Sequence, residues 1–304
     1  MFGGYIQSGV YKTLNGKAGL PGWKWIFVID FIITVPIAVL GYIILPDSPN
    51  QAKPSKILSQ KDLDFCAERV RVIKKVENGN KFDLKVVKKM FTSWQFYVFV
   101  FYYCVGHLPS TATSYWAIVL KAQGYNVYQR NNIPTTKSAF NVVACIVGGL
   151  LVDILGRYWE IMTVANSIWV IALSILVKWD VPRGAQFYAY ITSGISGLIS
   201  TLCCSWTNEM TREDNQLRAA VLGSLNLINI GPSTAFSTTV FNTDYAPRYE
   251  KGTRIALGIA VISLLSGFVV LWFDRYQRRK RDYIEDQALA GKVTEHNEVI
   301  DITN

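Results

Sequence analysis

Long apolar runs alternate with short polar segments along most of the chain. Each run has close to the roughly 20 apolar residues that a helix needs to cross a bilayer core about 30 Å thick. The runs are too long and too continuously apolar for the alternating strands of a membrane barrel. They predict an all-α integral membrane protein with about seven transmembrane helices, at 24–45, 94–116, 136–155, 159–178, 187–206, 219–241 and 255–273.

One polar segment is much longer than the others. Residues 46–93 follow the first predicted helix and contain a helical stretch from Ser59 to Glu77. Ser59-Gln60-Lys61-Asp62 predicts a capping box at its start, and Asn78-Gly79-Asn80 predicts a turn after it. We interpret this segment as a solvated linker between two helical bundles, with a regulatory domain as the alternative.

Composition and charge agree with a membrane setting. Only 17% of the residues are charged, against about 25% in soluble domains. The net charge of +9 is concentrated, because eleven of the 31 Lys and Arg lie between Lys53 and Lys89 and five more between Arg275 and Arg281. Both clusters flank predicted helices. This is typical of the positive-inside rule and of contact with anionic lipid, and it argues against nucleic-acid binding.

The same charges predict the orientation. Placing 46–93 in the cytoplasm puts 20 of the 31 basic residues in inner segments, with the N-terminus outside and the C-terminus inside. Four of the five cysteines fall inside predicted helices, so no disulfide framework is expected. Neither a metal-ligand spacing nor a nucleophile–base pair, phosphate loop or carboxylate dyad stands out. The sequence therefore predicts no enzyme, metal or cofactor.

The sharpest local motif joins the third and fourth predicted helices. It runs from Gly148 to Arg157, and Gly149, Asp153, Gly156 and Arg157 are its characteristic positions. Glycines permit close approach of helices and a tight turn. A carboxylate at the bilayer edge can meet Arg157 or a helix N-terminus. We interpret these four residues as a conformational latch; a plain inner turn is the alternative.

This motif resembles the cytoplasmic loop signature of the major facilitator superfamily, although Tyr158, Trp159 and Glu160 replace the usual basic residues after the arginine. Other segments resemble one fungal group within it, the allantoate permease and vitamin anion:cation symporter family. They are Gly19-Leu20-Pro21-Gly22-Trp23-Lys24-Trp25-Ile26-Phe27-Val28-Ile29-Asp30, Leu45-Pro46-Asp47-Ser48-Pro49, Gln129-Arg130-Asn131-Asn132-Ile133-Pro134, Ser205-Trp206-Thr207-Asn208-Glu209, Leu217-Arg218-Ala219 and Ala246-Pro247-Arg248-Tyr249.

The resemblance maps the chain onto spans six to twelve of that family and implies a truncated bundle. It divides the chain into the end of an N-terminal bundle (1–46), a basic linker (47–93), a C-terminal six-helix bundle (94–274) and a cytoplasmic tail (275–304). It implies plasma-membrane transport of a small organic anion, such as a vitamin, amide or sulfur compound, coupled to protons. A separate N-terminal half is then a possible partner, beside the substrate, protons and the lipid bilayer.

Polar residues inside predicted helices are costly in lipid, so they are candidate pathway residues. In the second helix four of them follow a 0, 3, 4, 7 spacing on one face: His107, Ser110, Thr111 and Ser114. Pro109 is expected to bend this helix. In the sixth helix Asn226 and Asn229 lead a polar face with Ser233 and Ser237, which Gly231-Pro232 is expected to interrupt. Hydrogen bonding between helices is the alternative for both sets.

Three further charged residues are candidates for a gate or ion pair: Asp30, Glu209 and Arg218. Asp30 lies inside the first helix, where Lys24 is one expected partner.

Two other interpretations of the whole chain stay open. One is a non-transporting permease remnant or sensor, and the other is a seven-helix receptor. The sequence leaves open the substrate, the coupling ion, the oligomeric state and whether this chain acts alone.

Overall fold

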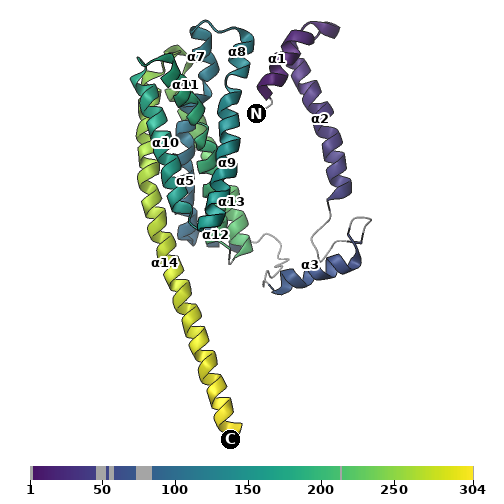
Figure 1. The fold of residues 1–304 in the computed structure, drawn as a ribbon, viewed down its shortest axis with the longest axis vertical. Coiled ribbons are helices and arrows are strands. Elements are labelled where there is room, and N and C mark those ends of the chain that lie inside the picture. The colour runs from purple at the N-terminus through teal and green to yellow at the C-terminus, as the bar shows by residue number, and fades with distance from the viewer. Residues whose placement is uncertain (1–2, 46–52, 55–57, 73–83, 213, 304) are drawn as a thin grey trace. The chain divides into compact units, whose positions relative to one another are not determined.

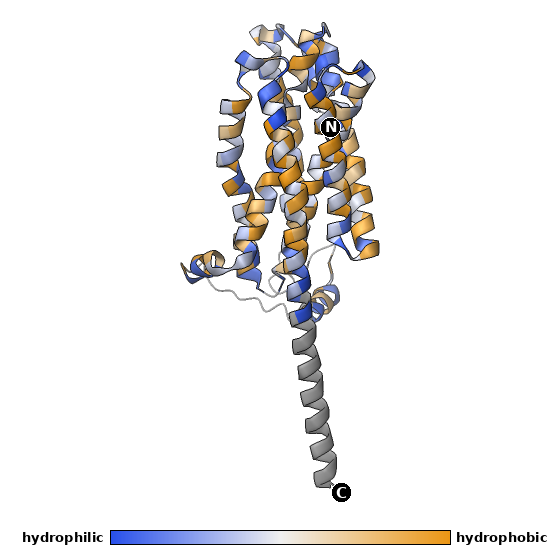
Figure 2. Ribbon diagram, turned by 90° about the vertical axis from the view of Figure 1, so that its left-hand side faces the viewer, coloured by the Kyte–Doolittle hydropathy of each residue, from blue (hydrophilic) through white to orange (hydrophobic). Residues whose placement is uncertain are grey.

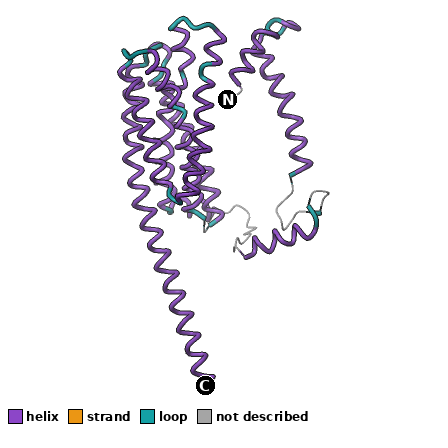
Figure 3. Tube along the Cα trace, in the orientation of Figure 1, coloured by secondary structure: helices purple, strands orange, loops and turns teal. Residues whose placement is uncertain are grey.

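The computed structural model describes residues 3–45, 53–54, 58–72, 84–212 and 214–303. All regular elements in these ranges are helices, as Figures 1 and 3 show. Contacts divide the chain into two compact units, Phe2–Asp83 and Leu84–Asn304. The all-α prediction is confirmed for the described part of the chain.

The first unit contains α1 (Gly3–Thr13), the short η1 (Lys17–Gly19), α2 (Gly22–Ile44) and α3 (Gln60–Val72). Helix α1 packs on α2. The Gly22 backbone N–H donates to Asn15 Oδ1 at 2.8 Å, and Trp25 Nε1 donates to the Lys17 carbonyl at 3.2 Å. These two bonds fix the turn that leads into α2, the first predicted transmembrane helix.

The capping box at the start of α3 is confirmed. The Ser59 backbone N–H donates to Asp62 Oδ2 at 3.0 Å, and the Ser59 hydroxyl donates to the same oxygen at 2.6 Å. The hydrogen bond from Ser59 lowers the pKa of the exposed Asp62 carboxyl. The Pro46–Pro49 segment and the predicted turn at Asn78–Asn80 lie outside the described residues.

The second unit is a helical bundle built around α5. It comprises α4 (Leu84–Thr92), α5 (Trp94–His107), η2 (Leu108–Ser110), α6 (Thr111–Ser114), α7 (Trp116–Ala122), α8 (Val127–Asn132), α9 (Thr135–Leu155), α10 (Tyr158–Lys178), α11 (Arg183–Thr192), α12 (Ile195–Met210), α13 (Asn215–Val240), η3 (Thr243–Tyr245) and α14 (Glu250–Thr303). Helix α5 packs against α12, α13 and α14, and α10 packs against α12 and α14. Helix α4 packs on α13 and α5.

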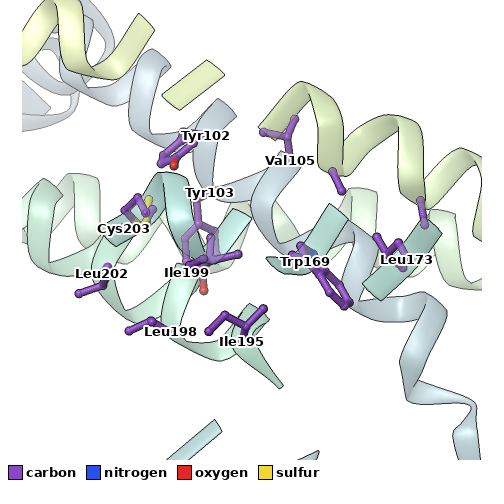
Figure 4. Close-up of a cluster of buried hydrophobic side chains, with 14 of the residues drawn as sticks. Tyr102, Tyr103, Val105, Trp169, Leu173, Ile195, Leu198, Ile199, Leu202 and Cys203 are labelled. Atoms are coloured by element: carbon purple, nitrogen blue, oxygen red, sulfur yellow. The ribbon is translucent and has the colours of Figure 1, made fainter. Parts of the chain in front are cut away.

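The core of this bundle lies where α5, α10 and α12 meet. Figure 4 shows Tyr102, Trp169 and Ile199 among its buried side chains. Trp169 and Trp206 are both fully buried, and Phe99 meets Trp206 edge to face at 6.0 Å between ring centroids. These aromatic residues are among the largest side chains that are fully buried in the bundle.

Outside this core, the long helices expose apolar side chains. On α9 the exposed large apolar residues are Val142, Val143, Ile146, Val147, Leu150, Leu151, Ile154 and Leu155. Hydrophobic residues run along the outer faces of the helices in Figure 2. A continuous apolar surface of this size is unfavourable in water and favourable in lipid. Within the described residues, five helical segments are long and apolar enough to cross a membrane: Gly22–Ile44, Val127–Leu155, Tyr158–Lys178, Arg183–Met210 and Glu250–Gln277.

Of the two remaining predicted spans, one is divided and the other is a single helix. The 94–116 segment is divided at Pro109 into α5, η2 and α6, as expected from the proline. The 219–241 segment is one helix, α13, that continues through Pro232, so the predicted interruption at Gly231-Pro232 is wrong. Pro232 removes one backbone donor, but the flanking turns keep their hydrogen bonds and helical geometry. The predicted tail from 275 continues as part of α14 to Thr303.

Small residues bring α9 and α12 together. A side-chain carbon on Gly194 would lie 2.4 Å from the Lys137 carbonyl oxygen, and one on Gly197 would lie 2.2 Å from Asn141 Oδ1. Neither position has room for a Cβ atom. Glycine at positions 194 and 197 therefore permits the close packing of α12 on α9.

Candidate functional site

A row of polar contacts joins α5 and the segment after it to α13. Tyr103 donates its hydroxyl to Asn226 Oδ1 at 2.7 Å. Asn229 Nδ2 lies 3.1 Å from His107 Nδ1, and the Tyr115 hydroxyl lies 2.6 Å from Ser237 Oγ. We call these six residues the α5–α13 polar seam. Residue numbers rise together along both sides, so the two helices run parallel here.

The contact between His107 and Asn229 is at the middle of the seam. The His107 ring stacks on Tyr103, with centroids 5.9 Å apart and planes 14° apart. Asn229 is 6% exposed, and its buried Oδ1 atom has no hydrogen-bond partner in the part of the chain that the structure describes. A neutral imidazole with its proton on Nε2 accepts from the Asn229 amide through Nδ1. Proton uptake at Nδ1 turns that nitrogen into a donor, which then requires the free Asn229 oxygen.

The structure thus brings together three of the predicted pathway residues, His107, Asn226 and Asn229. It adds Tyr103 and Tyr115, which are not among the pathway residues predicted from the sequence. Neither has a local sequence signal, because their contacts with α13 join residues more than 120 positions apart. The polar faces of α5 and α13 gave the signal for the other members.

The other predicted pathway residues lie just beyond His107. The hydroxyls of Thr113 and Ser114 both donate to the Ser110 carbonyl, each at 3.1 Å. Thr111 is buried and Ser110 is partly buried. This turn therefore satisfies part of its own hydrogen-bonding capacity while it places several hydroxyl groups together.

Lys137 was missed among the candidates. It is the third residue of α9, and its Nζ atom donates to Thr113 Oγ1 at 2.6 Å. The signal was present in the sequence, since Lys137 is the one basic residue between Arg130 and Arg157.

The four latch residues occupy the end of α9 and the turn into α10. Gly156 has a φ of 65° and ends α9 in the left-handed region, which favours glycine. Arg157 Nη1 donates to Glu160 Oε1 at 2.8 Å. Asp153 is exposed, and Gly149 has no neighbouring atom where a Cβ would stand. Arg157 thus pairs with Glu160, one of the three residues that stand where the resembling signature has basic residues.

The three gate candidates do not pair with one another among the described residues. Glu209 lies 3.5 Å from Arg212 Nη1, and Arg218 Nη2 donates to Asn215 Oδ1 at 2.7 Å. Asp30 is exposed on α2. Lys24, its expected partner, instead lies over the Trp23 ring, with its Nζ atom 5.5 Å from the ring centroid. A gate role for these residues stays a prediction.

A cavity of about 310 Å³ lies at the end of the bundle where α5 and α13 begin. Its lining residues are Lys89, Gln95, Met210, Thr211, Asp214, Leu217 and Gln277. Lys89 and Asp214 form an ion pair there that connects α4 to the start of α13. Burial opposes ionisation of Asp214. The Leu217 N–H and the Lys89 ammonium outweigh that effect and lower the pKa of the carboxyl.

No group of three or more His, Cys, Asp or Glu side chains in the described ranges is placed to hold a metal ion. The helical bundle, its lipid-compatible outer faces and its internal polar seam instead define an integral membrane protein. Residues 1–233 match the family model of the Major Facilitator Superfamily. The chain belongs to this superfamily, and the resemblance seen in its sequence motifs is confirmed.

Curated relatives narrow the comparison to fungal transporters. The chain is 32% identical over 308 residues to pantothenate transporter liz1 of Schizosaccharomyces pombe, an alignment that covers 97% of this chain and 58% of the relative. It is 31% identical to MFS transporter PfmaC of Pestalotiopsis fici, in an alignment that covers 95% of this chain and 56% of the relative. It is 28% identical to the vitamin H transporter of Saccharomyces cerevisiae, covering 91% and 48%. The chain spans about half the length of these relatives.

Proposed function

We propose that this chain supplies the C-terminal bundle of a permease that carries a small organic anion across the plasma membrane, with protons as the coupling ion. The α5–α13 polar seam is the observation that supports this proposal most directly. Transporters with internal repeats bind substrate near the bilayer midplane, between helices that carry polar groups. Buried polar side chains inside a lipid-facing bundle are what such a site requires.

The names of the relatives support the substrate class. One is a pantothenate transporter and another is a vitamin H transporter. Both names describe small molecules of the kind expected from the family resemblance. For this chain we propose a pathway lined by His107, Ser110, Thr111, Ser114, Asn226 and Asn229, with Asp153 and Arg157 in the latch.

The contact between His107 and Asn229 supports proton coupling. Histidine is the side chain that proteins most often use to take up and release protons near neutral pH, and the Asn229 amide lies in contact with its Nδ1 atom. Protonation of Nδ1 removes its acceptor and favours rotation of the Asn229 amide, which brings the unpartnered Oδ1 toward the new N–H. Tyr103, stacked on the ring and bonded to Asn226, would pass this rearrangement along the seam.

Uptake in transporter-deficient cells tests the proposal. Labelled pantothenate, biotin, nicotinate, allantoate and a sulfonate are supplied at pH 5 and pH 7. The chain is expressed alone and together with the N-terminal half of a relative. We expect uptake that is faster at pH 5. Membrane insertion without uptake under any condition would contradict the proposal and favour the remnant, sensor or receptor alternatives.

A histidine variant tests the coupling step in the same cells. His107→Ala should reduce uptake at pH 5 by about tenfold, within the usual range of coupling between two ligands, and should flatten the pH profile. Ser174→Ala is the matched control, because that hydroxyl is exposed and bonds only to the Val170 carbonyl of its own helix. An unchanged pH profile in His107→Ala would show that this histidine does not couple protons.

A further inference from the structure

Lys137 places a positive charge inside the second unit, in a segment apolar enough to span a membrane. The segment is Val127–Leu155, and Lys137 lies in the first turn of α9. Its side chain is partly buried, so the ammonium does not extend freely into solvent. A charge at this depth is costly unless a partner or a pathway compensates it.

The partners of the Lys137 ammonium do not balance its charge. An ammonium has three N–H donors. One of them donates to Thr113 Oγ1 at 2.6 Å, and the Thr113 hydroxyl in turn donates a hydrogen bond to the Ser110 carbonyl at 3.1 Å. Among the described residues, the ion pairs of the second unit join other side chains, and no carboxylate lies within 4.0 Å of Lys137. The full charge therefore meets one neutral oxygen.

The position of this ammonium is fixed by the helices around it. The Lys137 backbone packs directly against Gly194, at the junction of α11 and α12. Its side chain then crosses to α6, a segment that packs on α13 and α14. Lys137 thus connects two groups of helices and ends beside the hydroxyl-bearing turn that follows His107.

A second cation in the preceding helix adds to the imbalance. Arg130, on α8, has a buried Nε atom without a hydrogen-bond partner among the described residues. The described structure pairs neither Arg130 nor Lys137 with a carboxylate. This part of the bundle accordingly has positive charge and unused N–H donors, which is the environment that an organic anion requires.

We propose that the Lys137 ammonium binds the carboxylate of the transported molecule, with the Thr113 hydroxyl as a neighbouring polar contact. This inference rests on the proposed function and deepens it, because it assigns the substrate class to carboxylate anions. Lys137 supplies charge compensation, and the α5–α13 polar seam contacts the remaining polar groups of the substrate. A lysine that only ties α9 to α6 through Thr113 would not discriminate between charged and neutral ligands.

Paired substrates separate these two roles. Uptake of pantothenate is compared with that of its alcohol counterpart panthenol, in cells that contain the full chain with the N-terminal half. We expect wild type to prefer the carboxylate by at least about tenfold, and Lys137→Met to lose that preference. Lys137→Arg should keep most of it, since the charge remains. Thr113→Val, which removes the acceptor but not the ammonium, should keep the preference as well.

Lys178→Met is the matched control, because it removes a positive charge from the exposed end of α10. It should leave the preference unchanged. Membrane abundance of every variant is measured alongside uptake. Wild-type uptake combined with an intact preference in Lys137→Met would overturn the inference and leave the proposed function standing. Absence of wild-type uptake of every anion in the panel would overturn both.

Chemical labelling gives a readout that does not depend on a variant folding. Purified wild-type chain is treated with formaldehyde and a mild reductant, and methylation of Lys137 is followed by mass spectrometry. Pantothenate should slow methylation at Lys137 at least about tenfold, and panthenol should not. Lys178 serves as the internal reference. Equal protection by both compounds, or protection by neither, would overturn the inference.

Discussion

The Asn229 amide nitrogen contacts His107, and its oxygen has no partner among the described residues, whereas both polar atoms of the Asn166 amide form hydrogen bonds. The Asn166 amide donates to the Met162 carbonyl at 2.9 Å and accepts from Ser263 Oγ at 2.9 Å. Both side chains are buried. Asn166 therefore serves to join α10 and α14, and Asn229 retains the unused hydrogen-bonding capacity that a binding or switching site needs.

Asp214 gives a prediction for a single carboxylate. It caps α13 by accepting from the N–H groups of Gln216 and Leu217, both at 3.0 Å, and it pairs with Lys89. Its lowered pKa means that its charge stabilises the fold above the unfolded value of about 3.9. That contribution is lost as the pH falls through the lower, folded value.

Carbon-13 NMR of labelled aspartate in detergent measures this pKa, and we expect an inflection below about 3.9. Asp214→Asn keeps a capping acceptor but removes the charge. Because the ion pair is partly exposed, this change should cost less than about 1 kcal/mol at pH 7. Asp244→Asn, in the exposed η3 turn, is the comparison. An inflection of Asp214 at or above the ordinary value would contradict the assignment.

At the scale of helices, the sequence and the structure agree where a signal is local. The capping box at Ser59, the division at Pro109 and the glycine end of α9 at Gly156 each depend on a few neighbouring residues. Pro232 is the exception, because α13 stays helical through it. In a packed membrane bundle the surrounding turns retain their hydrogen bonds, so loss of one donor does not end the helix.

The packing of α9 on α12 gives a second prediction. Gly194→Ala forces a methyl group against the Lys137 carbonyl, a backbone atom that cannot move aside. We expect this to destabilise the bundle by about 1–3 kcal/mol, the usual cost of overpacking. Thermal unfolding in detergent measures it. Gly258→Ala is the control, since no atom lies within 4 Å of its Cβ position on α14. Equal melting temperatures for the two variants would refute the close contact.

At the scale of the whole molecule, the basic segments predict the orientation in the membrane. Cys66 is exposed on α3, within the linker that we expect in the cytoplasm. An impermeant maleimide should label Cys66 only after permeabilisation of the cells. A cysteine introduced by Lys121→Cys, at the exposed end of α7, should react in intact cells. Peptide mapping distinguishes the two sites, and labelling of Cys66 in intact cells would reverse the proposed topology.

The sequence by itself determined the membrane class, the superfamily and the approximate position of most long helices. It did so because apolar length, charge distribution and short motifs act over about 20 neighbouring residues. It also indicated His107 and Asn229 separately, from polar positions on two apolar helices.

Only the tertiary structure decided which of these polar groups meet. Tyr103 contacts Asn226 across 123 positions of the chain, and Lys137 reaches Thr113 from a different helix. Such contacts depend on the relative rotation and depth of packed helices, which no single helix specifies. The seam and the uncompensated charge of Lys137 therefore became visible only once the bundle was assembled.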